Sequence, residues 1–62
     1  MGCGELVLEL RMRMRDVAPG QILWLTARDP GAPEDIPSWC RMTGNPLIKH
    51  DHPEYWIQRQ GD

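Results

Sequence analysis

The stretch from residue 22 to residue 44 constrains the fold of this chain more than any other part of its sequence. The apolar run ILWLTA at 22–27 predicts a strand. The segment RDP at 28–30 predicts a turn after it. Residues 33–43 then predict a helix with a proline in its first turn, and Gly44 suits the cap at its carboxyl end. A strand, a turn and a helix in this order indicate a small α/β domain.

The strand predicted at 22–27 is apolar on both of its faces, which is typical of a strand inside a sheet or beneath a partner. Leu47 and Ile48 begin a short strand further along the chain. Residues 50–54 predict a polar turn, and residues 55–59 alternate as a half-exposed final strand. The second half of the chain therefore adds two strands to the one predicted at 22–27.

Residues 5–17 fit two periodicities. Apolar and charged side chains alternate over much of this segment, as in a strand, but one side also repeats at helical spacing. That side is formed by Leu6, Leu10, Met14 and Val17. Leu, Glu, Met and Arg are good helix formers, and Glu5 near the start with Arg15 near the end match the direction of the helix dipole. We therefore predict a helix here.

These elements follow one another in the order α-β-α-β-β. We predict an α+β fold, a two-layer sandwich in which two helices pack on one face of a small mixed sheet. Residues 1–62 are expected to form a single domain, because a chain of 62 residues is too short for two cores. A core of this size rarely supplies more than about 3–5 kcal/mol.

The composition excludes several classes of protein. The net charge of −2 argues against a dedicated nucleic-acid binder. The sequence shows neither a signal peptide nor a long apolar run, so a membrane protein is not expected. With only two cysteines, Cys3 and Cys40, the chain does not resemble a secreted disulfide scaffold. We expect a cytoplasmic protein with reduced thiols.

Five short motifs together resemble the TusA/SirA family of small bacterial sulfur-carrier proteins. They are Pro19-Gly20 before the apolar strand, the Asp29-Pro30 turn, DIPSWC at 35–40, Gly44, and the closing YWIQR at 55–59. The resemblance covers the chain from Cys3 onward. It implies a two-layer sandwich of order β-α-β-α-β-β, similar in shape to the C-terminal domain of translation initiation factor 3. Compared with that order, the chain lacks the first strand.

In this family a Cys-Pro-x-Pro motif lies between the first strand and the first helix, and its cysteine carries a persulfide. By position Cys3 matches that cysteine, with Cys3-Gly4-Glu5-Leu6 in place of the motif. Both prolines are absent. A cysteine just before a helix is suited to the chemistry, because free backbone N–H groups and the helix dipole favour the thiolate that must attack sulfur. Because both prolines of the motif are absent, the chain resembles the fold of this family more closely than its active motif.

The resemblance implies a sulfurtransferase-like carrier, if Cys3 is active. Persulfide sulfur would pass through Cys3 from a donor, such as a cysteine desulfurase or a rhodanese-like protein, to an acceptor protein. Family pathways include tRNA thiolation and sulfur oxidation, and the chain itself would need no cofactor and no direct contact with nucleic acid or a membrane. The alternative is a non-catalytic binding or regulatory module, a shortened family member that associates through its open sheet edge or face, for example as a homodimer.

Two sets of residues are candidates for binding partners. Arg11, Arg13 and Arg15 on or near the first helix could steer an acidic partner, or form an ordinary solvated face. Trp24 and Trp56 fall on strands. If both point away from the helices, the open face of the sheet carries an aromatic patch of the kind that marks interfaces. The competing interpretation places at least one of them in the core.

The remaining reactive side chains have structural interpretations. Cys40 and Trp39 are predicted to lie in the core, on the helix face that also carries Ile36 and Thr43. His50 and His52 could offer two imidazoles to a metal. We expect instead that both are solvent-exposed in a polar turn, and we predict no metal site.

Overall fold

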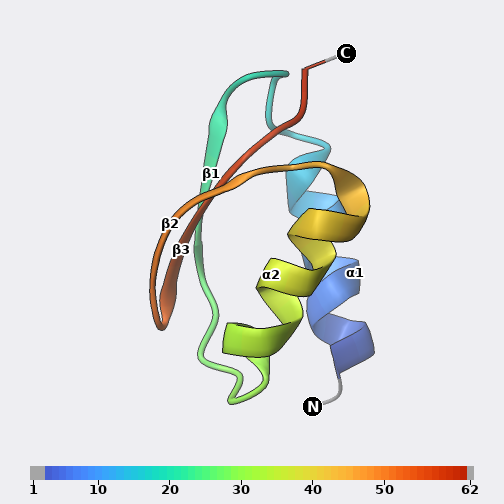
Figure 1. Cartoon of the computed structure of the whole chain (residues 1–62). Coiled ribbons are helices and arrows are strands. Elements are labelled where there is room, and N and C mark those ends of the chain that lie inside the picture. The colour runs from blue at the N-terminus through green and yellow to red at the C-terminus, as the bar shows by residue number, and fades with distance from the viewer. Residues whose placement is uncertain (1–2, 62) are drawn as a thin grey trace.

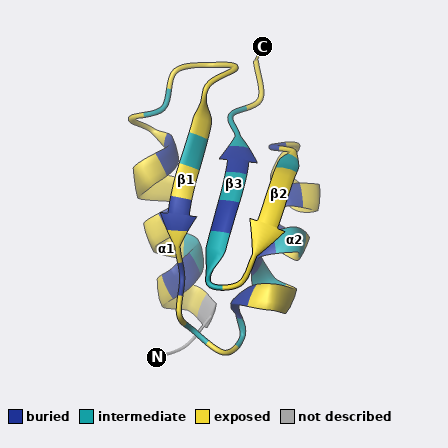
Figure 2. Ribbon diagram, turned by 90° about the vertical axis from the view of Figure 1, so that its left-hand side faces the viewer, coloured by how far each residue is buried: buried dark blue, intermediate teal, exposed yellow. Residues whose placement is uncertain are grey.

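Two helices and three strands follow one another in the predicted order α-β-α-β-β (Figure 1). The computed structural model describes residues 3–61, and the side chains of residues 4–61. Its elements are α1 (Cys3–Met14), β1 (Ile22–Thr26), α2 (Ala32–Thr43), β2 (Leu47–Asp51) and β3 (Glu54–Gln58). Both helices cover the same face of the sheet, α1 behind β1 and α2 behind β2 (Figure 2). The two-layer α+β sandwich is confirmed.

The sheet has the strand order β1-β3-β2, so the last strand lies in the centre. Both pairings are antiparallel, with Trp24 opposite Trp56 in the first and Asp51 opposite Glu54 in the second. The described sheet is therefore antiparallel rather than mixed. The reason is that β3 lies between β1 and β2, which run in the same direction without touching. Strand β2 also extends to Asp51, so the predicted polar turn is shorter than expected.

The apolar sequence of β1 was consistent with a strand inside the sheet. In the described sheet, however, β1 lies at one edge. The central position belongs to β3, whose Tyr55 and Ile57 are 1% and 0% exposed beneath the helices. In β1 only Leu25 is fully buried, and Trp24 on the opposite face is 65% exposed. The prediction of an interior strand is wrong for the described residues. The alternative expectation, that a partner covers this strand, stays a prediction.

Helix α1 forms along the predicted face. Leu6, Leu10 and Met14 are buried at a spacing of four residues. The helix ends at Met14 rather than at Val17, and Arg15 lies just beyond it. Its last turn tightens there, because the Val17 N–H donates to the Met14 carbonyl, three residues back, at 3.2 Å.

The predicted Pro19-Gly20 turn is also present. The Gln21 N–H donates to the Ala18 carbonyl at 2.9 Å, and Gly20 has a φ of 86°. A positive φ at the third position of a turn is what a type II turn requires, and glycine adopts it without steric cost. This turn reverses the chain from α1 into β1.

Helix α2 packs the predicted residues into the core and ends where predicted. Its buried residues are Ala32, Ile36, Trp39 and Cys40. Gly44 adopts a φ of 79° and donates its N–H to the Cys40 carbonyl, which caps the helix. Thr43 differs from the prediction because it is exposed; its hydroxyl donates to the Trp39 carbonyl at 2.8 Å. Within residues 3–61, no helix combines the length and the apolar character needed to cross a bilayer.

Candidate functional site

The candidate sulfur-carrying residue Cys3 is the first residue of α1. Its side chain lies outside the described part of the structure. The first four backbone N–H groups of a helix have no intrahelical partner, and the helix dipole makes this end electropositive. An anion bound or formed here is stabilised, and a thiol that ionises here is a better nucleophile at neutral pH. The backbone therefore places residue 3 where a thiolate is favoured.

The turn that follows is open. A Cβ built on Gly4 would meet no atom within 4 Å, so there is open space beside its Cα. Gly4 and Glu5 are both exposed. Glu5 places a carboxylate in the first turn, the end of the helix where an acidic side chain is favourable.

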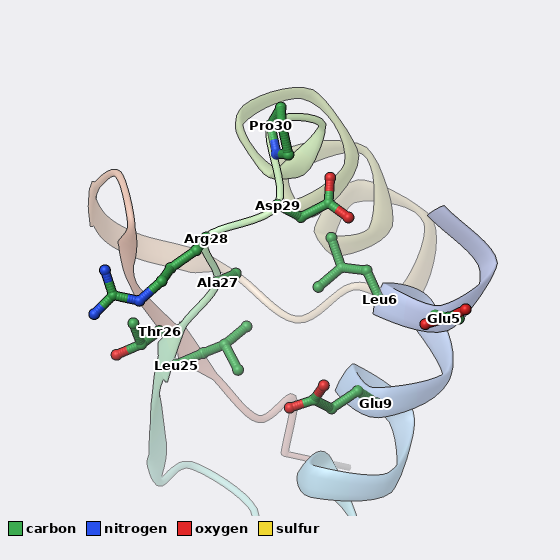
Figure 3. Close-up of a pocket in the computed structure, with 9 residues that line it drawn as sticks. All are labelled: Glu5, Leu6, Glu9, Leu25, Thr26, Ala27, Arg28, Asp29 and Pro30. Atoms are coloured by element: carbon green, nitrogen blue, oxygen red, sulfur yellow. The ribbon is translucent and has the colours of Figure 1, made fainter. Parts of the chain in front are cut away.

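A cleft of about 750 Å³ lies beside this first turn (Figure 3). One wall comes from α1, and the other from the end of β1 and the loop that follows it. Its lining residues are Glu5, Leu6, Glu9, Leu25, Thr26, Ala27, Arg28, Asp29 and Pro30. Figure 3 shows the Glu9 carboxylate directed toward β1 and the Arg28 side chain extending away from α1. The cleft is thus an open, partly apolar hollow with an acidic helix wall.

The loop that forms the end of this cleft is held by its own backbone and by Asp29. The Asp29 Oδ1 accepts a hydrogen bond from the Gly31 N–H at 2.7 Å, and its carbonyl accepts one from the Ala32 N–H at 3.0 Å. These bonds fix the start of α2 although Gly31 offers no side-chain cap. The Asp-Pro turn therefore shapes the cleft as well as the entry to the helix.

The three arginines proposed for partner binding are exposed but do not form one patch. Arg13 donates from Nε to Glu9 Oε2 at 2.9 Å, in a pair whose side chains are both about half exposed. Arg11 and Arg15 lie on the other side of α1, where they line a hollow of about 190 Å³ together with Arg59. Arg59, from the end of the chain, was missed because nothing in the local pattern links it to α1. Its guanidinium donates to the Val17 carbonyl.

The outer face of the sheet carries an aromatic cluster, which we call the tryptophan face: Trp24, Trp56, Lys49 and Glu54. The two indole rings are nearly parallel, with their centres 6.2 Å apart. Glu54 Oε1 accepts hydrogen bonds from Trp24 Nε1 at 2.6 Å and from Thr26 Oγ1 at 3.1 Å. The Lys49 ammonium lies 5.1 Å from the Trp56 ring centre. Tyr55 and Ile57 on either side of Trp56 are buried beneath the helices, so both tryptophans lie on the opposite face, and the interpretation that placed at least one of them in the core is wrong.

Cys40 is a buried free thiol, as predicted for a core residue. It is 5% exposed, and burial raises its pKa to about 11. At neutral pH the thiol is therefore protonated and shielded from a second protein. Cys40 contributes packing and not nucleophilic chemistry.

Alkaline pH is expected to destabilise the protein through Cys40. The folded-state pKa of about 11 exceeds the ordinary value of 9.0. As the pH rises, the thiol of Cys40 therefore ionises at a lower pH in the unfolded chain than in the folded protein. The stabilisation is full below pH 9 and should decline by roughly 2–3 kcal/mol as the pH rises to about 11. Urea denaturation across this range measures it. Burial also raises the pKa of Tyr55, which acts in the same direction, so the Cys40→Ala variant should show a shallower decline. Identical slopes in the two proteins would contradict the assignment.

The two histidines are solvent-exposed, as predicted. His52 Nδ1 lies 2.6 Å from the Tyr55 hydroxyl, and the His50 ring stacks on Tyr55 with centres 6.5 Å apart. Tyr55 itself is 1% exposed, so the contact with His52 gives its buried hydroxyl a polar partner. Among the residues whose side chains are described, no three His, Cys, Asp or Glu groups are close enough together to hold a metal ion.

Comparison with known proteins gives one consistent result. The family model described as sulfurtransferase TusA matches residues 1–59. The sulfur carrier protein TusA of Pseudomonas paraeruginosa is 35% identical over 66 aligned positions, which cover the whole chain and 84% of that relative. The proteins of the same name from Pseudomonas syringae and Pseudomonas putida are 34% and 32% identical, and 76% and 82% of their lengths are covered. From this match along almost the entire sequence, the chain belongs to the sulfurtransferase TusA family.

Proposed function

We propose that this chain carries sulfane sulfur as a persulfide on Cys3, taking it from one protein and passing it to another. The observation that supports the proposal most directly is that α1 begins at Cys3, the residue that matches the family's sulfur-carrying cysteine. The other cysteine is buried with a raised pKa, so Cys3 is the better candidate for a nucleophile.

The transfer balances without an added oxidant. The Cys3 thiolate attacks the outer sulfur of a donor persulfide, a new S–S bond forms at Cys3, and the donor's own S–S bond breaks. The electron pair leaves with the donor sulfur as its thiolate. Passing sulfur to the acceptor repeats the same exchange with Cys3 as the leaving thiolate. Neither step requires a metal or an organic cofactor on this chain.

The partners in this proposal are a sulfur donor, such as a cysteine desulfurase or a rhodanese-like protein, and an acceptor protein. Both must reach the amino end of α1. The cleft of about 750 Å³ beside this turn offers a surface for them, and the exposed Arg11 and Arg15 on the neighbouring side of α1 can attract an acidic partner. Delivery of sulfur to tRNA thiolation in the cytoplasm belongs to the same proposal.

Sulfur loading tests the assignment of Cys3. Incubation with a cysteine desulfurase and free cysteine should add the mass of one sulfur atom to the protein, removable by a thiol reductant. The Cys3→Ser variant should show no such addition. Cys40→Ala serves as the matched control and should load like the wild type, because Cys40 is buried. Intact-protein mass spectrometry gives the readout, and peptide mapping gives the position. Equal loading of the Cys3→Ser variant would exclude Cys3 as the carrier.

A further inference from the structure

A small hollow between the carboxyl end of α1 and the middle of α2 is lined almost entirely by side chains that donate hydrogen bonds. We call it the arginine hollow. It has a volume of about 190 Å³, and its lining residues are Arg11, Met14, Arg15, Trp39 and Arg59. Figure 1 shows that the end of α1 and the last residues of the chain lie at the same end of the molecule. The fold thus brings arginines together that are far apart in the sequence.

The arginines of this hollow have no carboxylate partner among the described side chains. The one ion pair formed within residues 4–61 lies elsewhere on α1. Arg11 and Arg15 are four residues apart, a spacing at which like charges on a helix repel each other. The guanidinium of Arg59 donates to the Val17 carbonyl, a neutral group that fixes its position without cancelling its charge. Three positive charges therefore surround the hollow.

The nearest acidic side chains are directed elsewhere. Glu9 and Asp16 line a separate hollow of about 500 Å³ on another flank of α1. Asp35, one turn before Trp39 on α2, lies toward the start of that helix, where its Oδ2 would be 3.0 Å from a Cβ built on Gly31. No carboxylate of a described residue lines the arginine hollow. A bound cation would therefore meet only like charges there.

Trp39 adds a further donor at the floor of the hollow. Its side chain and that of Met14 are 5% and 7% exposed, so the floor is apolar. The indole N–H of Trp24 donates to Glu54, but that of Trp39 has no acceptor among the described residues. Since no buried side-chain nitrogen or oxygen of these residues lacks a partner, the Trp39 N–H reaches the surface. The surface that Trp39 lines is the arginine hollow, where a bound acceptor can take this hydrogen bond.

We propose that the arginine hollow binds a free tetrahedral oxoanion of the size and charge of phosphate or sulfate. Guanidinium groups bind such ions through pairs of parallel hydrogen bonds. Four oxygens directed to the corners of a tetrahedron can meet donors from α1, α2 and the end of β3, whereas a carboxylate offers two oxygens in one plane. The apolar floor lowers the local dielectric, which strengthens these bonds. The hollow holds the volume of about six water molecules, which suits one such ion with part of its hydration.

This site is separate from the end of α1 that would carry sulfur. Arg11 lies eight residues after Cys3, about 12 Å along the helix axis. No residue of the first turn of α1 lines the arginine hollow. Anion binding can therefore be measured in the Cys3→Ser variant, in which the proposed sulfur carriage is impossible. The Cys3→Ser variant should bind the anion like the wild type, so the outcome does not depend on the proposed function.

NMR titration with inorganic phosphate or sulfate, at an ionic strength held constant with sodium chloride, tests the site. The three tryptophans give three indole N–H signals. The signal of Trp39 should shift and saturate, whereas those of Trp24 and Trp56, on the outer face of the sheet, should stay unchanged. Trp24→Phe and Trp56→Phe assign the three signals. An unchanged Trp39 signal, or parallel shifts of all three, would overturn the proposal.

Arg11→Gln and Arg13→Gln form a matched pair, because each removes one positive charge from the exposed surface of α1. Arg11→Gln should weaken anion binding at least tenfold, since a guanidinium leaves the hollow. Arg13→Gln should bind within twofold of the wild type, since Arg13 is paired with Glu9 outside the hollow. Acetate, with one charge and two oxygens, should bind at least tenfold more weakly than phosphate. Equal effects of the two substitutions, or equal binding of acetate and phosphate, would contradict a tetrahedral oxoanion site.

Discussion

Replacing Leu10 with alanine is expected to leave most of the protein unfolded at room temperature. Leu10 is 0% exposed and lies in the centre of the core face of α1. A buried Leu→Ala change costs about 2–5 kcal/mol, through lost burial and the cavity that remains. A core of this size supplies only about 3–5 kcal/mol in total. The loss is therefore comparable to the whole stability, and urea denaturation followed by circular dichroism should show it.

Leu8 provides a matched control on the same helix. It is the same residue type, two positions away, but 56% exposed. Leu8→Ala should change the free energy of unfolding by less than about 0.5 kcal/mol, as is usual for surface substitutions. If the two variants were equally destabilised, the core face of α1 would be assigned to the wrong residues.

The same argument connects the core to the candidate site. Helix α1 has only 12 residues, and isolated helices of about 12–15 residues are marginal in water. The amino end of α1, where Cys3 lies, is therefore helical because Leu6 and Leu10 pack against the sheet and stabilise the helix. We expect Leu10→Ala to reduce sulfur loading of Cys3 together with stability, and Leu8→Ala to leave both unchanged.

Asn45→Ala is expected to lower the free energy of unfolding by about 1–3 kcal/mol. Asn45 is 8% exposed and joins the end of α2 to the end of the chain. Its Oδ1 accepts the Gln60 N–H at 2.8 Å, and its Nδ2 donates to Thr43 Oγ1 at 3.0 Å. Without the amide, the Gln60 N–H loses its partner in a partly buried position. Denaturant titration measures the loss, and faster hydrogen exchange of the Gln60 amide would locate it.

Gln60→Ala separates the backbone bond from the side chain. The bond to Asn45 comes from the Gln60 main chain, which alanine keeps, and the Gln60 side chain is exposed. This variant should therefore remain within about 0.5 kcal/mol of the wild type. A larger loss from Gln60→Ala than from Asn45→Ala would show that the side chain of Gln60, and not the buried amide, holds the end of the chain.

Local sequence patterns were sufficient for the elements and for the position of Cys3. The spacing of Leu6, Leu10 and Met14 predicted α1, and both Gly20 and Gly44 occupy the positive-φ positions that their contexts require. These features depend on neighbours a few residues apart, which the sequence displays directly. The motifs that resembled the TusA/SirA family are likewise short and contiguous, and the comparisons confirmed that family.

Only the tertiary structure decided which strand is central and which side chains meet across the sheet. The run ILWLT was more apolar than the final strand, yet β1 lies at the edge and β3 in the middle. Strand order depends on pairings between residues far apart in the sequence. A strand that is apolar on both faces is compatible with an interior position in the sheet and equally with an edge that a partner covers. The contact between Trp24 and Glu54 joins residues 30 positions apart, so no local pattern could show it. The sequence alone determined the elements and the family, while long-range pairing determined the exposed edge and the tryptophan face beside it.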